Sequence, residues 1–376
     1  MDKDDTDNSK SIESYLYWTA SKCTDPVCYV HETIWRYRLI DSLPKNSRPL
    51  SSNFSMITSP SKTFLSIPGA AVGTVFRWIA AALQDEPYIY TKSKKEDKLL
   101  PEKKQISHLL WNICCVGAGY SITEGGVVPW KERIDRIAEQ IIETDADVNS
   151  IYETFDIDSA FYLSEKLSSK GYHCFYNIGP NIVGTSSGIF VASKYKVVNA
   201  KFTPFSKDTL LGRTKNCKKG VFQFDLTSDG KTFAPVLSTH LQHSEKPEFP
   251  TNEEVLSREK QMQAMLEITK KLPPHCILVN GDLNLDDREF ENSSWKDLFE
   301  KGKIHGTEKT WGGDAFCASL MNKEASKPLN LDHAMIIKGS ARSISSKIIS
   351  SKFDGTTFKK EALSDHNRVL TIIEIS

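Results

Sequence analysis

The sequence lacks an excess of charge of either sign. Its 376 residues include 48 Lys and Arg and 48 Asp and Glu, so the formal net charge at pH 7 is zero. A polyanion such as DNA is attracted by net positive charge, and a neutral total therefore disfavours a nonspecific nuclease. A basic stripe within a neutral total would still allow nucleic-acid binding.

The sequence also lacks repeated Cys-x-x-Cys pairs, although it has eight cysteines. This argues against a zinc site and a disulfide framework, and we expect free thiols in a reducing compartment. Cys23 and Cys28, with four residues between them, could form a disulfide as the alternative.

Signatures of export and of nucleotide binding are missing too. Met1 to Asp7 is acidic and polar, the opposite of a Sec signal peptide. No Walker, Rossmann or zinc-protease motif is present. We expect a cytoplasmic or peripheral membrane location, with secretion by a specialised system as an alternative that leaves no pattern in the sequence.

One long apolar segment is present, from Phe64 to Leu83. It just reaches the roughly 20 residues of a membrane span, and Gly69 and Gly73 have the spacing of closely packed membrane helices. Pro68 and Arg77 interrupt it. A helix buried against the rest of the chain is therefore the first expectation, and a membrane span or an interfacial anchor are the alternatives.

The sequence before this segment predicts short helical pieces after a disordered start. Aromatic-bearing helices are expected around Ser11 to Ser21 and His31 to Leu43. Pro44, Pro49 and the Ser-rich run Ser47 to Ser61 predict a break in regular structure.

The composition changes again after the apolar segment. The Lys-rich run 92–104 is typical of a solvated linker, with a lipid-facing basic patch as the alternative. We therefore divide the chain into an N-terminal extension, 1–105, and a second domain, 106–376. In the second domain, strands alternate with amphipathic helices such as Trp130 to Ile142 and Asn252 to Leu272.

Apolar strands of the second domain end in polar residues. The tetrad Gly281-Asp282-Leu283-Asn284 follows the apolar run 276–279, and the strand 236–242 delivers His240 and Gln242. Ligands of layered folds bind at such strand ends. Further strand edges carry Asn112, Glu153, Asp332, and Asp365 with His366.

This ordered set resembles the endonuclease/exonuclease/phosphatase superfamily, and within it the bacterial and neutral sphingomyelinases, over about residues 106–376. Thr239-His240-Leu241-Gln242 is similar to the sphingomyelinase histidine motif, and a helix with Arg258 and Gln261 follows it as in that family. Lys219-Gly220-Val221 and Thr310-Trp311 also resemble family elements. The resemblance implies an α/β fold, a four-layer α/β/β/α sandwich like deoxyribonuclease I, here with a small helical N-terminal extension.

The resemblance implies a site for Mg²⁺ or another divalent cation. Glu153 is the expected first ligand, with Asn112 beside it, and Asp365 would support the metal side. Hard divalent cations take such oxygen ligands.

The resemblance also implies catalytic roles. Asp282 would orient and deprotonate the attacking water, while Asn284 and His240 would hold the phosphoryl oxygens. His366 would be the second acid or base, or a donor to the transition state, and Asp332 would fix its tautomer and raise its pKa.

Three positions depart from the family pattern. Tyr152 precedes Glu153 where a Gln or similar polar residue is usual, and His333 follows Asp332 in place of Tyr. Asn367 follows the Ser-Asp-His motif, where most relatives have a Pro close by. No catalytic group is lost, so we expect activity, while the resemblance says less about the shape of the substrate pocket.

We therefore expect a Mg²⁺-dependent phosphodiesterase acting on a phospholipid headgroup at a membrane surface, in the manner of a sphingomyelinase that releases ceramide and phosphocholine. A nuclease of the same superfamily is an alternative. An inositol polyphosphate phosphatase is less favoured, because the Trp-Cys-Asp-Arg signature is absent around Asp332. An interaction protein with a vestigial site is the alternative of another class, and no obligate protein partner is inferred.

Overall fold

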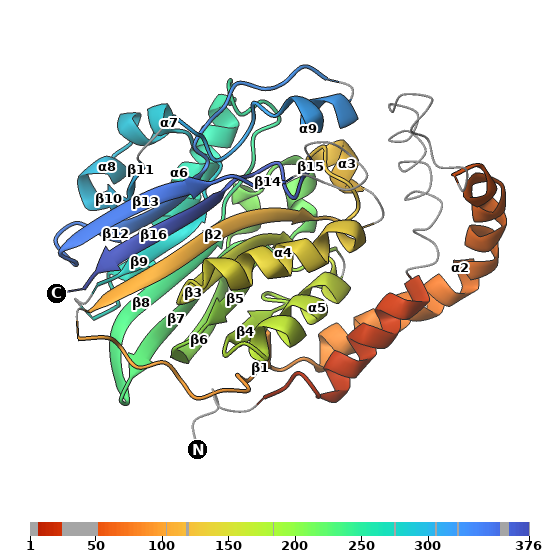
Figure 1. The fold of residues 1–376 in the computed structure, drawn as a ribbon, viewed down its shortest axis with the longest axis horizontal. Coiled ribbons are helices and arrows are strands. Elements are labelled where there is room, and N and C mark those ends of the chain that lie inside the picture. The colour runs from red at the N-terminus through yellow and green to blue at the C-terminus, as the bar shows by residue number, and fades with distance from the viewer. Residues whose placement is uncertain are drawn as a thin grey trace.

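Two β-sheets packed face to face form the centre of the protein (Figure 1). The computed structural model describes residues 7–24, 52–102, 104–117, 120–182, 184–273, 276–304, 307–321, 323–353 and 361–375. Within these residues, one sheet has eight strands, the other has six, and a small sheet has two.

The eight-stranded sheet has its first strand outside the expected second domain. β1 precedes residue 106 and pairs with β4. The spatial order in the described part of the sheet is β1 (Ile89–Thr91), β4 (His173–Tyr176), β5 (Phe190–Ser193), β3 (Val148–Thr154), β2 (Gln105–Cys115), β16 (Arg368–Glu374), β13 (Ser343–Ile349) and β11 (Lys303–Ile304).

The six-stranded sheet is mainly antiparallel, with β8 and β9 parallel. Its described strands follow the order β10 (Phe299–Lys301), β12 (Asp332–Ile337), β9 (Leu278–Asp282), β8 (Lys231–His240), β7 (Gly220–Ser228) and β6 (Lys196–Pro204). The small sheet pairs β14 (Lys352–Phe353) with β15 (Glu361–Ala362).

Helices cover the outer faces of both sheets (Figure 1). α4 (Trp130–Thr144) and α5 (Ile157–Ser168) pack on the eight-stranded sheet, and α6 (Asn252–Thr269), α7 (Asp287–Asn292) and α8 (Trp295–Leu298) pack on the other. The shorter helices are α3 (Tyr120–Glu124), η3 (Lys207–Thr209), η4 (Gly212–Asn216) and α9 (Ala315–Leu320).

The sequence of β2 shows why the sheet is buried on both faces. Leu110 contributes to the core between the two sheets, while Leu109, Trp111 and Ile113 contribute to the core under α4 and α5. Successive side chains of a strand point to opposite faces, so a strand that is apolar at consecutive positions fills two cores. The four-layer sandwich is confirmed.

The N-terminal region contains a helix over 12–24 and the longer helix α2 (Ser52–Leu83). The expected break over Ser47 to Ser61 is therefore wrong from Ser52 onward. A proline within a helix removes one backbone hydrogen bond, and α2 continues through both Pro60 and Pro68. The expected helix at His31 to Leu43 lies outside the described residues.

One side of α2 packs against the rest of the protein. A Cβ added to Gly73 would lie 2.7 Å from the carbonyl oxygen of Ala20, so this glycine allows close contact with the helix 12–24. Ala80 is fully buried with Tyr17 in the core under α4 and α5. The opposite side of α2 is exposed, and the expectation of a buried helix holds for one side only.

The alternative of a membrane span is not supported. Among the helices of the described residues, none combines the length and apolar character needed to cross a bilayer. The described part of the Lys-rich run, 92–102, forms neither helix nor strand.

The described cysteines are free thiols, and most of them are buried. Cys28 lies outside the described residues, so the alternative pairing with Cys23 stays untested.

Candidate active site

Three predicted site residues lie side by side on the six-stranded sheet. In the register of β8, β9 and β12, His240 is level with Asp282, and Asp282 is level with Asp332. Each occupies the last or first position of its strand. Side chains far apart in the sequence therefore meet in one row at the end of the sheet.

The other sheet supplies Asn112 and Glu153 from its central strands β2 and β3. Asn112 is level with Tyr152, the neighbour of Glu153, and the pairing of the two strands becomes irregular after it. Glu153 and Asn284 have positive φ values of 59° and 52°. This backbone conformation is costly for residues other than glycine, and such residues often lie at functional sites.

Asp282 is the residue that the two halves of the site share. Its Oδ2 accepts a hydrogen bond from Asn112 Nδ2 at 2.9 Å and lies 3.5 Å from His240 Nε2 and 3.8 Å from His366 Nε2. Its Oδ1 accepts from the backbone N–H of Asn284 at 3.1 Å. Burial alone would raise the pKa of this carboxyl, but His240 and His366 hold it below its usual value.

His366 and Asp332 form a buried pair. His366 Nδ1 lies 2.8 Å from Asp332 Oδ2, and both side chains are almost inaccessible to solvent. Burial lowers the pKa of an imidazole, but Asp332, Asp365 and Asp282 together raise the pKa of His366 well above its usual value. His366 is therefore an imidazolium near neutral pH, and its Nε2 faces Asp282.

Neighbouring side chains fix this pair in position. Thr310 Oγ1 accepts from the backbone N–H groups of Leu331 and Asp332, and Trp111 Nε1 donates to the carbonyl of His366. Trp311 Nε1 donates to Asp365 Oδ2 at 3.3 Å.

The carboxylate of Glu153 is destabilised by its surroundings. Burial and the carboxylates of Asp365 and Asp282 raise the pKa of Glu153 to about 7. Its side chain is 24% exposed, and Glu153, His240 and Asp282 offer ligand atoms within 4.8 Å of one another. Crowded carboxylates with access to solvent fit a divalent cation, because the cation offsets their repulsion.

Three further atoms of the described site have unused hydrogen-bonding capacity. Within the part of the chain that the structure describes, His240 Nδ1 and Asp332 Oδ1 are buried without a hydrogen-bond partner. Asn112 Oδ1 accepts one hydrogen bond, from Cys114 N–H, and keeps a second lone pair.

Lys219 is a site neighbour to which the sequence analysis gave no role. Its Nζ is buried and donates to the carbonyl of Leu241 at 2.6 Å, next to His240. Burial and the Lys219 ammonium lower the pKa of His240 well below its usual value, so this imidazole is neutral. A lysine directly before the apolar strand β7 is the sequence signal that points to it.

Gln242 and Arg258 organise the loop after His240. Gln242 Oε1 accepts from the N–H of Leu211, and Gln242 Nε2 donates to Thr214 of η4. Arg258 of α6 donates to the carbonyl of Gln242 and makes a two-bond ion pair with Glu289 of α7 at 2.7 and 2.6 Å.

The three departures from the family pattern are structural in this protein. The Tyr152 hydroxyl lies in the core between the sheets and contacts Ser238 Oγ and Asn280 Oδ1. His333 is buried with Nε2 2.9 Å from the carbonyl of Leu285, and Asn367 Nδ2 donates to the carbonyl of Lys309. These residues therefore face the protein interior.

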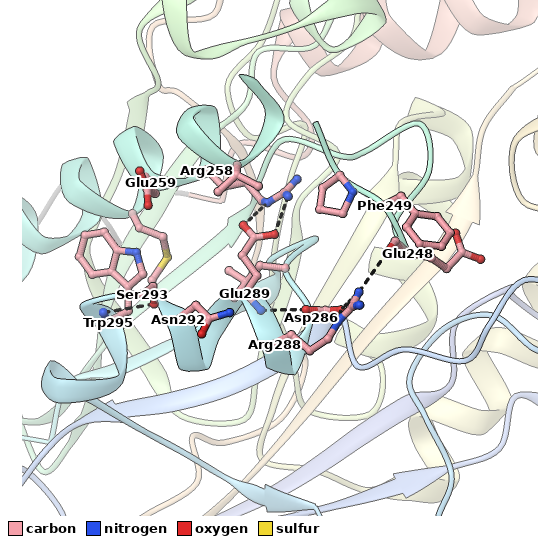
Figure 2. A pocket seen from close by; sticks show the side chains of 14 residues that line it. Glu248, Phe249, Arg258, Glu259, Asp286, Arg288, Glu289, Asn292, Ser293 and Trp295 are labelled. Atoms are coloured by element: carbon pink, nitrogen blue, oxygen red, sulfur yellow. Dashed lines mark hydrogen bonds and ion pairs between the residues drawn. The ribbon is translucent and has the colours of Figure 1, made fainter. Parts of the chain in front are cut away.

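A separate groove of about 450 Å³ lies between α6 and α7 (Figure 2). The Arg258–Glu289 pair lies in its middle, Trp295 at one end and Phe249 at the other. Among the described residues, no predicted site residue lines this groove.

Comparison with known proteins identifies the fold. No family model matches the sequence, and no curated protein is similar to it. Solved structures do match. An endonuclease/exonuclease/phosphatase family protein from Bacteroides thetaiotaomicron has a TM-score of 0.51 at 14% identity, over 72% of this chain and 97% of that one. The chain has the endonuclease/exonuclease/phosphatase fold.

Three named proteins of known structure are also similar to this chain. A mutant beta toxin of Staphylococcus aureus with bound magnesium ions has a TM-score of 0.58 at 18% identity, over 71% of this chain and 99% of that one. Sphingomyelinase C of Streptomyces griseocarneus has a TM-score of 0.55 at 18% identity, over 71% and 98%. D. rerio TDP2 with a single-strand DNA product has a TM-score of 0.51 at 16% identity, over 71% and 98%.

Proposed function

We propose that this protein is a Mg²⁺-dependent phosphodiesterase that hydrolyses a phospholipid headgroup, with sphingomyelin as the first candidate substrate. The observation that carries the proposal is the convergence on Asp282 of an amide and two imidazoles, with Glu153 and Asp332 beside them. Phosphodiester hydrolysis needs an activated water, donors to the phosphoryl oxygens and a proton for the leaving oxygen.

Glu153 and Asn112 would hold the cation, with Asp365 supporting that side. When bound, the cation would supply charge stabilisation at the phosphoryl oxygens. The crowding that raises the pKa of Glu153 supports this choice of ligand.

The remaining groups would act on the water and the phosphoryl group. Asp282 would orient the attacking water and take its proton, since its low pKa keeps it ionised. Asn284 and the neutral His240 would contact the phosphoryl oxygens. The imidazolium of His366, held by Asp332, would donate to the developing charge and pass its Nε2 proton to the leaving oxygen.

The choice of a lipid substrate has three supports. A sphingomyelinase C shares the fold, and Gln242 of the sphingomyelinase-like motif organises the loop beside His240. The neutral net charge gives no general attraction to nucleic acid.

The test compares substrates and metal dependence directly. Purified protein is assayed for phosphocholine release from sphingomyelin vesicles and for nucleotide release from plasmid DNA, with Mg²⁺ and with EDTA. We expect Mg²⁺-dependent phosphocholine release and no DNA cleavage. DNA cleavage alone would favour a nuclease function. Activity on neither substrate would favour the alternative of an interaction protein with a vestigial site.

A further inference from the structure

The outward side of α2 is apolar and open to solvent. Seven of its large side chains are 43–74% exposed: Phe64, Ile67, Val72, Val75, Trp78, Ile79 and Leu83. Spacings of mostly three or four residues put them along one side of the helix. The stretch 64–83 extends over about 30 Å, and soluble monomers rarely leave so long an apolar surface uncovered.

This surface carries no charge. Arg77 is the one charged residue from Phe64 to Leu83, and its guanidinium turns inward and donates to the carbonyl of Gly184. On the adjoining helix 12–24, Tyr15 and Trp18 are also exposed, with ring centroids 5.8 Å apart.

The same contact connects α2 to the rim of the candidate active site. Thr185, next to Gly184, exchanges backbone hydrogen bonds with Asn216 and Lys218. Lys219 follows, and its Nζ binds the carbonyl beside His240. The inner side of α2 therefore contacts the segment that leads to Lys219 and His240.

We infer that the outward side of α2, together with Tyr15 and Trp18, docks on the surface of a phospholipid bilayer. This inference rests on the proposed function, because hydrolysis of a phospholipid headgroup takes place at a bilayer surface. The strip from Phe64 to Leu83 exposes no charge, and Lys22 Nζ lies over the ring of the neighbouring Trp18. Such an apolar strip with Trp, Tyr and a lysine beside it matches the bilayer interface, where amphipathic helices lie along the surface and aromatic rings are favoured. A protein partner would normally pair with a polar rim around such a strip.

The test is co-sedimentation of the full-length protein with vesicles of phosphatidylcholine and sphingomyelin. We expect wild type to bind and the Val75→Ser/Ile79→Ser variant to bind at least tenfold more weakly. Phe64→Ser, at the most exposed position of the seven, should weaken binding without affecting packing. Leu256→Ser on α6 is the matched control, since Leu256 is 50% exposed, and it should bind as wild type does.

Several results would overturn the inference. Wild type that stays in solution, or α2 variants that sediment as wild type does, would exclude docking through this surface. Light scattering could instead show a wild-type dimer and a monomeric Val75→Ser/Ile79→Ser variant. That result would show that the surface binds a second copy of the chain.

A water-soluble phosphodiester separates this result from the proposed function. Cleavage of that substrate without vesicle binding would support the proposed hydrolytic function and exclude membrane docking. Vesicle binding without any hydrolysis would support membrane docking and exclude the proposed function.

Discussion

Asp282 interacts with side chains from both halves of the site. The two imidazoles beside it differ in protonation state. His366 is an imidazolium because Asp332 lies against it, whereas His240 is neutral because it is buried near Lys219. Two imidazoles of the same residue type therefore have different capacities, one as a proton donor and one as a neutral ligand or hydrogen-bond partner.

Replacing His366 by Ala should lower turnover by about 10²–10⁴-fold, because it removes a positioned acid. Asp282→Ala should lower it at least as far. Circular dichroism and thermal unfolding should show an intact fold in both. His243→Ala is the control, since this imidazole is partly exposed and three residues from His240. A wild-type turnover rate in either variant would contradict the catalytic role proposed for the replaced residue.

Glu153 predicts the pH dependence of metal binding. Its pKa of about 7 means that protons compete with the cation below neutral pH. Mg²⁺ affinity, measured by calorimetry, should be about tenfold lower at pH 6 than at pH 8. The same slope in Glu153→Gln would show that another group is responsible.

The contribution of Glu153 to the folding stability of the metal-free protein changes with pH in the opposite direction: it decreases as the pH rises, whereas the Mg²⁺ affinity increases. The pKa of Glu153 is raised above its usual 4.5, so protonation favours the folded state. This contribution is complete below about pH 4.5 and is lost as the pH rises through about 7.

At the scale of strands and helices, the site depends on contacts that tie neighbouring elements together. Tyr152 of β3 reaches across to β8 and β9, and Arg258 of α6 joins the loop after β8 to α7. Both residues hold strand ends of the candidate site in position without a predicted role in the chemistry.

Tyr152→Phe should destabilise the protein by about 1–3 kcal/mol, because Ser238 and Asn280 lose a buried partner. Urea unfolding measures the change, and activity below the unfolding transition should persist. Tyr15→Phe, at an exposed position, should have no effect. A Tyr152 variant as stable as wild type would show that water replaces the hydroxyl.

Arg258→Met should cost about 3–5 kcal/mol, since it leaves the Glu289 carboxylate without its partner in a mostly buried position. The Arg258→Met/Glu289→Leu double variant should recover much of the loss. Equal stability of the single and double variants in urea unfolding would contradict this account of the pair.

The strand ends could be predicted from sequence, because an apolar run followed by Asp282 or His240 has a local pattern. Tyr152 could not be assigned in this way, since its partners lie on strands of the other sheet. The start of α2 was missed because Ser and Pro near Ser52 locally favour a break, whereas contacts of the later turns with the helix 12–24 stabilise the helix. The positive φ of Glu153 and the position of Lys219 also depend on the packed sheets.

At the scale of the whole molecule, the site spans the interface between two sheets. Asn112 and Glu153 come from one sheet, and His240, Asp282 and Asp332 come from the other. Glu153 and Asn112, which would hold the cation, therefore lie on one sheet and face Asp282 and His240 on the other.

Mg²⁺ should therefore raise global stability. At 100 times its dissociation constant, a ligand that binds only the folded state adds about 2.7 kcal/mol. Thermal unfolding with and without Mg²⁺ measures this, and Glu153→Ala should remove most of the increase. Ca²⁺ at the same concentration tests whether the effect is general for divalent cations. No shift of the wild-type transition with either ion would argue against a cation at this interface.

The position of β16 has a consequence for biosynthesis. This strand follows Asp365 and His366 directly and inserts between β2 and β13, although it is translated after both. A nascent chain still missing this segment has a gap in the middle of a sheet and no acid partner for Asp332. The proposed hydrolytic site would thus be complete only once Asp365, His366 and β16 have left the ribosome and joined the sheet.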